Sequence, residues 1–536
     1  DGYEYGAWNH IAISIDGESG YASIYVNGAP NAGPLAFSGI PSDPTIRIGA
    51  RMTNSGFFQG SFDDLRVYAG ALAADEIAAI RADGYFSGGR GTAASPYLVA
   101  TPMDLYNVRR FPAAHFRQTA DIDLSANAMT STWAPIVGPF TGTYDGGGRS
   151  VSNVALGAIT KAGSGFFEQI SIGGVVKNLT MNTMSASSSA ENLGALAGII
   201  TSATISDITI TGIDLTGTSY IGGLAGICTN GALTGVRVSG AIRATVPADP
   251  VQYIGGMAGT MSGTIEACTA DVAIDCESGS YVGGFAGSLE SGVPAITVTN
   301  CSSSGNISAG SYVGGFAGGT KLITNIDASH STGSVHASGG TGGGFTGSAS
   351  GSGIISQCYA TGSVTGTRIL GGFTGNISDT AKILQSYAIG SVTGSNVSLG
   401  GFAGIVLGGA IENCYARGDV TMNGSYVGVA GFAGKITYTG ATVKWSYSSG
   451  TIKNGTGAFI GSTETNKTYN GSNSGCYWHT ETAGTLGNPN SADTTGTVNG
   501  PSGSDLKAGT VLPNWDTNIW GDFSEGTYPT LAWEHE

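Results

Sequence analysis

The chain has 536 residues, of which 91 are glycine and 16 are proline, and 11% are charged while 40% are hydrophobic. This composition excludes a disordered chain, which needs low hydrophobicity and high charge, and the lack of a Gly-X-Y period excludes collagen. The net charge of -15 argues against nucleic-acid binding, which needs a basic stripe, and no apolar run approaches the roughly 18 residues of a membrane span. These exclusions leave a folded, turn-rich, all-β and repetitive protein.

Residues 1–84 form a first segment in which short apolar stretches alternate with turn residues. The stretches are Trp8-Asn-His-Ile-Ala12, Tyr25-Val-Asn-Gly28, Ile46-Arg-Ile-Gly49 and Phe62-Asp-Asp-Leu-Arg-Val-Tyr68. In this order they resemble the second half of a laminin-G-like (concanavalin-like) jelly roll, and residues 71–81 fit the short helix that follows its last strand. The resemblance implies a partial β-sandwich at the N-terminus.

A half sandwich would leave an apolar face and strand edges uncovered, which is unfavourable in water. Three explanations stay open: the chain was cut, the upstream part was lost, or another subunit donates the missing strands. The chain begins at Asp1 without a methionine and carries no signal-peptide pattern, so we expect a processed or partial product.

Calcium is the one cofactor that this first segment suggests. Asp16, Asp63 and Asp64 could ligate it, as acidic residues do in some laminin-G-like domains. Calcium needs six to eight oxygen donors, and two adjacent Asp residues on a strand point to opposite faces. A strand with one exposed and one structural Asp is therefore favoured, and we expect no cofactor elsewhere in the chain.

Residues 85–155 are predicted to be the lead-in and N-terminal cap of the repetitive region. Thr101 supplies an N-cap hydroxyl, Pro102 suits the first helical position, and Asp104 is acidic in the first turn. The pattern predicts a short helix that runs to about Arg110. A solenoid needs such caps because its ends expose unpaired strand edges.

A repeat dominates residues 156–475. One heptapeptide recurs as Tyr220-Ile-Gly-Gly-Leu-Ala-Gly226, residues 253–259, Tyr281-Val-Gly-Gly-Phe-Ala-Gly287 and residues 312–318, with weaker copies on both sides. The closing glycines from Gly198 to Gly461 mark ten units that average about 29 residues. Gly-Gly within the heptapeptide permits a bend or a close backbone approach that a side chain would block.

The pattern predicts an all-β fold built around a parallel β-solenoid of about ten coils. The apolar residues of the repeat are short and β-branched, at strand rather than helix spacing. Equivalent residues of successive coils would stack about 4.8 Å apart, so ten coils would make a rod on the order of 50 Å long. We expect interior columns formed by Val282, Phe285, Val313, Phe316, Phe345, Phe373, Phe402 and Phe432.

Residues 476–536 are predicted to form a C-terminal cap. The repeat fades after residue 475 into a tail that contains Trp515, Trp520 and Trp533. Bulky aromatic residues suit a cap because a few of them cover the open end of a solenoid.

The heptapeptide resembles the GLUG motif of large bacterial and archaeal surface proteins. The lead-in segments 91–98, 119–124 and 140–146 look like the segment that opens such solenoids, and residues 476–478 and 528–531 are similar to their usual close. The resemblance covers about residues 85–536. It implies an adhesin-like or structural surface role, carries no catalytic residues to transfer, and allows that the solenoid is the appendage of an enzyme, as in some members.

A column of small, weakly polar residues accompanies the repeat. Five cysteines and three serines share one register: Cys268, Cys301, Ser329, Cys358, Ser386, Cys414, Ser446 and Cys476. Such a position indicates a tight inward site, which suits buried thiols. A disulfide between Cys268 and Cys301 is the alternative, because adjacent coils bring them within disulfide range. Metal binding is disfavoured, since the ligands would form a line instead of a tetrahedron.

Tyrosines form two columns, which are the candidate contacts for glycans or for a protein partner. The first contains Tyr220, Tyr253, Tyr281 and Tyr312, and the second contains Tyr359, Tyr387, Tyr415 and Tyr447. Outward rings could stack on sugars or pack against a neighbouring rod. Inward rings would only fill the corner of the coil. Both orientations stay open.

Carboxylates give no sign of an active site. They are scattered through the repeat, and only Asp271 and Asp275 lie near each other. A solenoid hydrolase or lyase would need a cluster of Asp, Lys and Arg on one face. We therefore predict no enzyme activity and interpret the carboxylates as solvated loop charges.

The sequence as a whole predicts a secreted or cell-surface structural protein whose rigid solenoid serves adhesion or assembly into a filament, sheath or surface layer. Its partners would be further copies or neighbouring surface proteins, with glycans as an additional class and no nucleic acid. Two alternatives remain: a carbohydrate-binding surface module and the appendage of a polysaccharide-degrading enzyme.

Overall fold

The computed structural model describes most of the chain outside the first segment. The described residues are 9–16, 21–36, 77, 85–125, 132–156, 163–188, 191–244, 252–290, 295–322, 324–424, 428–437, 440–463, 475–479, 506–507, 512, 515–524 and 526–535. The contacts divide the chain into two compact units, Asp1–Asn107 and Val108–Glu536. The division falls inside the segment that the sequence predicts as the lead-in.

The first unit contains an antiparallel three-stranded sheet. Its strands are β1 (Ile11–Asp16), β2 (Tyr21–Val26) and β3 (Ala29–Ala36), in the order β1-β2-β3. Asn27 and Gly28 have positive φ angles of 54° and 78°, as a tight hairpin turn between β2 and β3 requires. The antiparallel strands agree with the concanavalin-like half that the sequence predicts. Asp63, Asp64 and the segments around 46–49 and 62–68 lie outside the described residues.

The predicted short helix is present in the segment that follows. After β4 (Tyr97–Val99), α2 spans Pro102–Asn107 and continues as the 3-10 helix η1 (Val108–Arg110). Thr101 Oγ1 accepts a hydrogen bond from the Asp104 amide at 3.1 Å, and Asp104 Oδ2 accepts one from the Thr101 amide at 3.0 Å. This reciprocal capping box fixes the start of α2 at the position that the sequence indicates.

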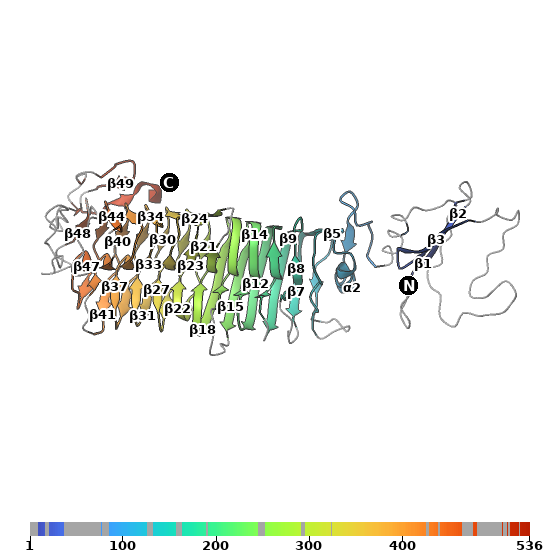
Figure 1. Cartoon of the computed structure of the whole chain (residues 1–536), viewed down its shortest axis with the longest axis horizontal. Helices are drawn as coiled ribbons and strands as arrows, with labels where there is room; N and C mark the ends of the chain where they lie inside the picture. Colours follow the sequence, from blue (N-terminus) through green and yellow to red (C-terminus); the bar gives the residue numbers. More distant parts are fainter. Residues whose placement is uncertain are drawn as a thin grey trace. The chain divides into compact units, whose positions relative to one another are not determined.

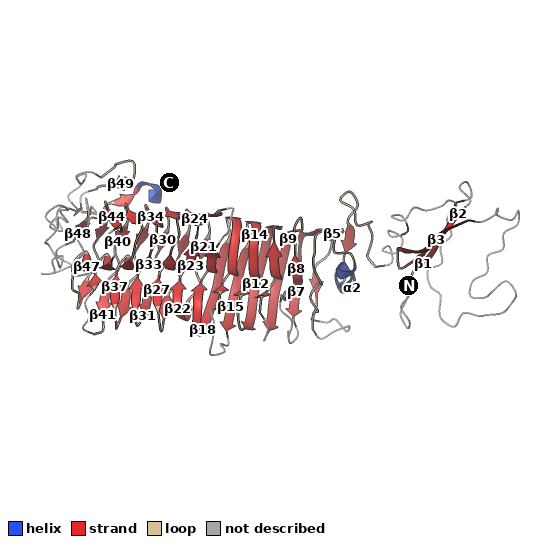
Figure 2. Ribbon diagram, viewed as in Figure 1, coloured by secondary structure: helices blue, strands red, loops and turns tan. Residues whose placement is uncertain are grey.

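The second unit is a parallel β-solenoid of about 11 turns. Figures 1 and 2 show its coils stacked side by side from β5 to β48, and every pairing between them is in parallel register. The solenoid prediction is confirmed, with one turn more than the ten counted from the sequence. Residues 163–170 supply an additional turn, because β8 (Phe167–Ile170) pairs with β11 (Ala197–Thr201), although this turn lacks the closing glycine.

The first coils use long strands, and the later ones use short strands. The long strands are β7 (Thr143–Ala155), β9 (Val175–Ser187), β12 (Thr204–Gly217), β14 (Ala225–Thr234), β15 (Arg237–Ala244), β17 (Ala258–Glu266) and β18 (Thr269–Gly283). The remaining strands up to residue 290 are β5 (His115–Gln118), β6 (Ile122–Asp123), β10 (Leu193–Gly194), β13 (Ile221–Gly222), β16 (Ile254–Gly255) and β19 (Ala286–Glu290).

From residue 296 onward, each coil passes through five short strand positions. The first position is held by β20 (Ile296–Thr299), β24 (Thr324–Asp327), β29 (Ile354–Ser356), β34 (Lys382–Leu384), β39 (Ala410–Glu412) and β44 (Thr442–Lys444). The second is held by β21 (Ser302–Ser303), β25 (His330–Ser331), β30 (Tyr359–Ala360), β35 (Tyr387–Ala388), β40 (Tyr415–Ala416), β45 (Tyr447–Ser448) and β48 (Tyr477–Trp478).

The other three positions complete the coil. The third is held by the start of β22 (Ile307–Gly314) and by β26 (Val335–Ala337), β31 (Val364–Gly366), β36 (Val392–Gly394), β41 (Val420–Met422) and β46 (Ile452–Lys453). The fourth is held by the end of β22 and by β27 (Thr341–Gly343), β32 (Ile369–Gly371), β37 (Ser398–Gly400) and β42 (Val429–Ala430). The fifth is held by β23 (Ala317–Lys321), β28 (Thr346–Ala349), β33 (Thr374–Ile377), β38 (Ala403–Val406), β43 (Ala433–Ile436) and β47 (Ile460–Thr463).

A column of phenylalanines runs through the core of these coils. Phe285, Phe316, Phe345, Phe373, Phe402, Phe432 and Phe459 are fully buried, and their adjacent ring centroids lie 4.6 to 4.9 Å apart. The spacing equals the distance between neighbouring strands, so each ring stacks on its equivalent in the next coil. The interior columns predicted from the sequence therefore lie inside the solenoid.

The second glycine of the heptapeptide allows the coils to approach. A side-chain carbon on Gly315 would collide with the Gly344 carbonyl oxygen of the next coil. The Gly-Gly pair thus permits close backbone contact, as the sequence predicts.

In the described tail, three short elements follow the last coil. These are β49 (Trp520–Asp522), which pairs antiparallel with β50 (Thr530–Leu531), and the 3-10 helix η2 (Ala532–His535).

Replacing a core ring should cost far more stability than replacing an exposed apolar residue. We expect Phe373→Ala to lower the free energy of unfolding by about 3–5 kcal/mol, because it leaves a cavity between two stacked rings. Ile389→Ala is the control, since this side chain is 43% exposed, and it should cost less than about 1 kcal/mol. Urea unfolding followed by circular dichroism measures both, and equal losses would contradict the buried stack.

Candidate functional site

The first tyrosine ladder consists of Tyr220, Tyr253, Tyr281 and Tyr312. All four rings are half-buried, and successive ring centroids lie 5.2, 5.3 and 4.8 Å apart. The rings of Tyr253, Tyr281 and Tyr312 therefore stack along the rod on the outside of the coils, and the Tyr220 ring is tilted by 33° against that of Tyr253.

The local backbone turns these rings outward. Tyr220, Tyr281 and Tyr312 have positive φ angles of 49°, 57° and 48°, which place each of them at a sharp bend before the core-facing residue of its heptapeptide. The Tyr281 ring lies over Gly319 of the next coil, where a side-chain carbon would come within 3.0 Å of the ring. Glycine at position 319 thus makes room for the ladder.

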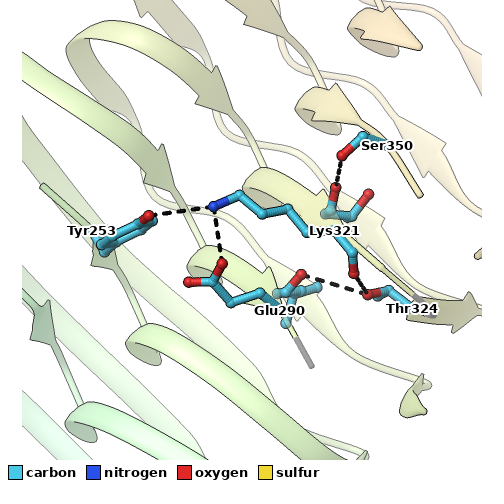
Figure 3. Close-up of polar contacts among 7 residues, drawn as sticks. Tyr253, Glu290, Lys321, Thr324 and Ser350 are labelled. Atoms are coloured by element: carbon cyan, nitrogen blue, oxygen red, sulfur yellow. Dashed lines mark hydrogen bonds and ion pairs between the residues drawn. The ribbon is translucent and has the colours of Figure 1, made fainter. Parts of the chain in front are cut away.

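Lys321 lies against the ladder, as Figure 3 shows. Its Nζ atom is 4.7 Å from the Tyr281 ring centroid and 5.3 Å from that of Tyr253, and it donates hydrogen bonds to Tyr253 Oη at 3.3 Å and to Glu290 Oε2 at 2.9 Å. Burial alone would lower the pKa of Lys321, but the bond to Glu290 and its charge raise the pKa above the ordinary value. The lysine is therefore a fixed cation at the side of the ladder.

This geometry limits what the first ladder can bind. Each inner ring uses both faces on its neighbours, so a sugar cannot stack on those faces. Ring edges and hydroxyl groups remain on the outside. Contact with a glycan or a protein partner at Tyr220, Tyr253, Tyr281 and Tyr312 stays a prediction, and it would have to use these edges.

The second tyrosine ladder consists of Tyr359, Tyr387, Tyr415 and Tyr447. It begins at His330, and successive ring centroids lie 4.6, 5.0, 4.8 and 5.1 Å apart. The rings come from the second strand position of successive coils, where the pairing of β30, β35, β40 and β45 is in register.

The C-terminal tail covers this second ladder. Trp533 lies 5.8 Å from the Tyr387 ring and Trp520 lies 5.9 Å from the Tyr447 ring, both between centroids. Trp515 stacks on Trp520 at 4.0 Å. Figure 1 shows β49 and the C-terminus beside β40 and β44. The described tail is thus a strap along the flank of the solenoid.

Arg417 fastens the strap to the ladder. Its guanidinium donates to Tyr447 Oη at 2.8 Å and to the Pro529 carbonyl at 2.8 Å, and it lies 4.4 Å from the Tyr415 ring centroid. Tyr447 Oη donates to the same Pro529 carbonyl at 2.7 Å, and Tyr415 Oη donates to Glu534 Oε2 at 2.9 Å. These bonds satisfy polar groups that the aromatic packing would otherwise bury without partners.

The strap bears on two predictions. The described tryptophans pack on the flank of the solenoid, and Trp515 also contacts Tyr477 of the last described coil; that residues 476–536 cap the open end stays a prediction. Tyr415 and Tyr447 are 1% and 0% exposed, so the strap excludes them from contact with a glycan or a partner. Tyr359 and Tyr387 are half-buried beside Trp533.

The column of cysteines and serines forms a sharp corner in each coil. The residue before each member has a positive φ, for example Ala328 (46°), Gln357 (51°) and Gln385 (46°). Ser386 Oγ accepts a hydrogen bond from the Cys358 amide at 3.2 Å and donates one to the Leu384 carbonyl at 2.7 Å. The γ atom therefore bonds a backbone amide of one coil and a backbone carbonyl of its own, which suits the serines and cysteines that hold this position from Cys268 onward. In the earlier coils the same register position holds the buried apolar residues Leu179, Ile208 and Val236.

All seven cysteines are free and buried. Cys268 and Cys301 are not bonded to each other in the structure, which favours the interpretation as buried thiols over the disulfide: Cys301 Sγ accepts a hydrogen bond from the Cys268 amide at 3.5 Å, in the same role as the serine hydroxyls. Burial raises the pKa of Cys228 and Cys476 to about 12. Thiols in such surroundings are inert toward oxidants and alkylating agents.

Most carboxylates of the solenoid have a structural task. Asp379 Oδ2 accepts a hydrogen bond from the Gly351 amide at 3.0 Å, Asp419 Oδ1 accepts one from the Thr451 amide at 2.8 Å, and Asp327 Oδ1 accepts one from Ser356 Oγ at 2.6 Å. Each of these bonds connects neighbouring coils. Among the described residues, no group of three or more His, Cys, Asp or Glu side chains could hold a metal ion.

Comparison with known families matches both parts of the chain. Residues 2–78 match the Concanavalin A-like lectin/glucanases superfamily. Residues 278–308 and 395–421 match the GLUG motif. The matches agree with the two resemblances found in the sequence.

Two curated relatives share part of the sequence. Halomucin of Haloquadratum walsbyi is 32% identical over 153 residues, which are 26% of this chain and 2% of halomucin. A protein of Evansella cellulosilytica, named as a candidate Gly-rich membrane protein, is 33% identical over 103 residues, which are 18% of this chain and 12% of that protein. The chain thus spans only a small part of the length of these relatives.

One solved structure can be compared over most of the chain. It is a candidate immunoglobulin A1 protease of Bacteroides ovatus, with 17% sequence identity and a TM-score of 0.29 over 84% of this chain and 96% of that one. No helix in the described residues is long and apolar enough to cross a membrane. The family matches and the fold together show that the chain carries GLUG motifs within a parallel β-solenoid, preceded in the sequence by a concanavalin-like segment.

The corner hydroxyl should be necessary for stability. We expect Ser386→Ala to lower the free energy of unfolding by about 1–3 kcal/mol, because it leaves the buried Cys358 amide without this partner and removes one of the two hydrogen bonds to the Leu384 carbonyl. Ser386→Cys should cost less, since cysteine holds the same position in other coils. Ser352→Ala, at an exposed position, is the control, and an equal effect of all three changes in urea unfolding would refute the role.

Because the strap buries tyrosines, the free energy of unfolding should depend on pH in the alkaline range. Burial raises the pKa of Tyr387, Tyr415 and Tyr447 above the ordinary value, which is about 10 in an unfolded chain. Above that pH the unfolded state binds fewer protons than the folded one, so the free energy of unfolding should fall as the pH rises.

Urea unfolding at a series of pH values around 10 measures this slope. Tyr387→Phe removes one titrating group whose hydroxyl makes no hydrogen bond in the described structure, so it should make the slope shallower. Tyr25→Phe, in the first unit, should leave it unchanged. A slope that is identical in all three proteins would contradict the assignment.

Proposed function

We propose that the chain is a non-enzymatic, secreted or cell-surface structural protein whose solenoid serves as a rigid rod in adhesion or assembly. The observation that carries this proposal is the continuous parallel register of the coils over about 11 turns. Backbone ladders join successive coils, and in the later coils seven stacked phenylalanines, from Phe285 to Phe459, and the corner hydroxyls and thiols join them as well. A rod built in this way resists bending at every coil.

The surface of the chain suits such a role. Its net charge of -15 keeps copies soluble at high local concentration, and only 22 lysines and arginines are present. The relatives support a surface location, since one of them is named as a membrane protein. The rod separates whatever is attached at its two ends by about 50 Å, from the strand spacing.

The carboxylates favour a role without catalysis. The described acidic residues mostly accept hydrogen bonds from the neighbouring coil, as Asp379 and Asp419 do. A hydrolase would instead need two carboxyl groups that face each other across a substrate. The structural use of these side chains supports the proposal that the solenoid is an architectural part.

Electron microscopy of the full chain, purified without denaturant, tests assembly. We expect regular filaments, sheets or tubes. Adhesion is tested in parallel by counting the attachment of coated beads to a panel of microbial cells. A variant with both Phe373→Ala and Phe402→Ala is the control, because its disrupted stack should lose either behaviour. Single rods that neither assemble nor hold beads on cells would overturn the proposal.

A further inference from the structure

A groove of about 610 Å³ runs across five coils on a face of the solenoid that neither tyrosine ladder occupies. It is open along its outer side. Its floor contains the small side chains of Ala241 and Ala273, and polar side chains line the rest. The polar groups used in the argument below are Arg243, Asp275, Asn306, Ser308, His336 and Thr365.

The polar lining forms a column with one group per coil. Arg243 pairs with Asp275, Asp275 with Ser308, Ser308 with His336, and His336 with Thr365. Successive groups are therefore separated by one strand spacing of about 4.8 Å. The groove presents a repeating row of hydrogen-bonding groups along the rod axis.

Several of these groups can form further hydrogen bonds. The Asp275 carboxylate and the Ser308 hydroxyl bond to no described side chain or backbone group. Asn306 Oδ1 accepts from the Ser334 amide at 3.0 Å and from Ser334 Oγ at 2.7 Å, which leaves the amide NH₂ as a donor. His336 Nδ1 lies 2.9 Å from Thr365 Oγ1, so its Nε2 remains available.

The chemistry of the groove excludes other ligands. Arg243 forms an ion pair with Asp214 at the surface, and Asp275 adds a negative charge, so a polyanion such as nucleic acid is not favoured. An extended peptide binds by adding to a strand edge, but these strands already pair on both sides. A small molecule would need a site that buries most of its surface, which an open groove does not provide.

We propose that this groove binds an extended, neutral polysaccharide that lies along the rod axis. Sugar hydroxyls both donate and accept hydrogen bonds, which matches the mixture of carboxylate, guanidinium, amide, imidazole and hydroxyl groups. Hydrogen bonds to the charged members are the stronger ones. A polymer repeats its hydroxyls as the coils repeat theirs, so several weak contacts add up. This function goes beyond the rod function and does not depend on it.

A matched pair of variants tests the groove. Asp271 and Asp275 are both exposed acidic residues on β18, but only Asp275 lines the groove. The probes are soluble dextran, mannan, xylan and β-glucan in native affinity gels of the full chain. We expect at least one to retard the protein, Asp275→Asn to weaken that binding about tenfold or more, and Asp271→Asn to leave it unchanged.

A second pair of variants tests an uncharged position of the column. Thr365→Ala should weaken binding to the retarding polysaccharide, whereas Thr421→Ala, in the same column two coils beyond, should not. Oligosaccharides of the same sugar should bind more tightly as they lengthen, up to the span of the five coils.

Four results would overturn the proposal. In the first, none of the four polymers retards the protein; in the second, Asp271→Asn and Asp275→Asn weaken binding equally. In the third, a charged polymer such as pectate binds more tightly than the neutral ones; in the last, neither Asp275→Asn nor Thr365→Ala weakens binding. The last result would place the polysaccharide on another surface, such as the concanavalin-like segment. None of these results bears on whether the rod assembles or adheres.

Discussion

The constraint on which the whole solenoid depends is the parallel register between coils. Each residue lies directly above its equivalent at the distance between two strands. Two identical apolar rings can stack at that distance, as Phe345 and Phe373 do at 4.9 Å, and a small hydroxyl or thiol group can accept a hydrogen bond from a backbone amide of the neighbouring coil. Unpaired like charges at the same distance would repel each other. The register therefore selects a sequence rich in aromatic, small and neutral residues.

The same constraint explains why the corner residues from Cys268 onward are cysteine or serine. A positive φ at the preceding residue turns the chain there. A γ atom that both accepts and donates hydrogen bonds then bonds the backbone amide of the neighbouring coil and a nearby carbonyl. Cys358 and Ser386 thus perform one task with different atoms. The cysteines of this column thus take part in the hydrogen bonding of the corners.

Much of the fold could be predicted from the sequence, because a repeat shows which residues of successive coils are equivalent and therefore stack. The period of about 29 residues, the buried Phe373 and Phe402 and the helix after Thr101 followed from spacing and capping alone. The site was less predictable. Tyr415 and Tyr359 stand in similar segments, Cys-Tyr-Ala-Arg-Gly-Asp and Cys-Tyr-Ala-Thr-Gly-Ser, yet the first is buried and the second is half-buried. The tail more than a hundred residues away covers one end of the ladder and bonds to Arg417, which stands where the other segment has Thr361.

The groove likewise could not be predicted from the local sequence. Asp275 and Arg243 are far apart in the sequence, and only the register of β15 and β18 makes them neighbours. Scattered charges in a repeat thus become a column once the period is exact enough to assign each residue to a coil. The first ladder, the second ladder with the strap that covers it, and the groove occupy separate faces of one rod, so its rigidity lets each face keep a fixed geometry. A rod of this kind can be a spacer and a binding surface together, since stacking fixes the core and leaves the outward residues free to vary.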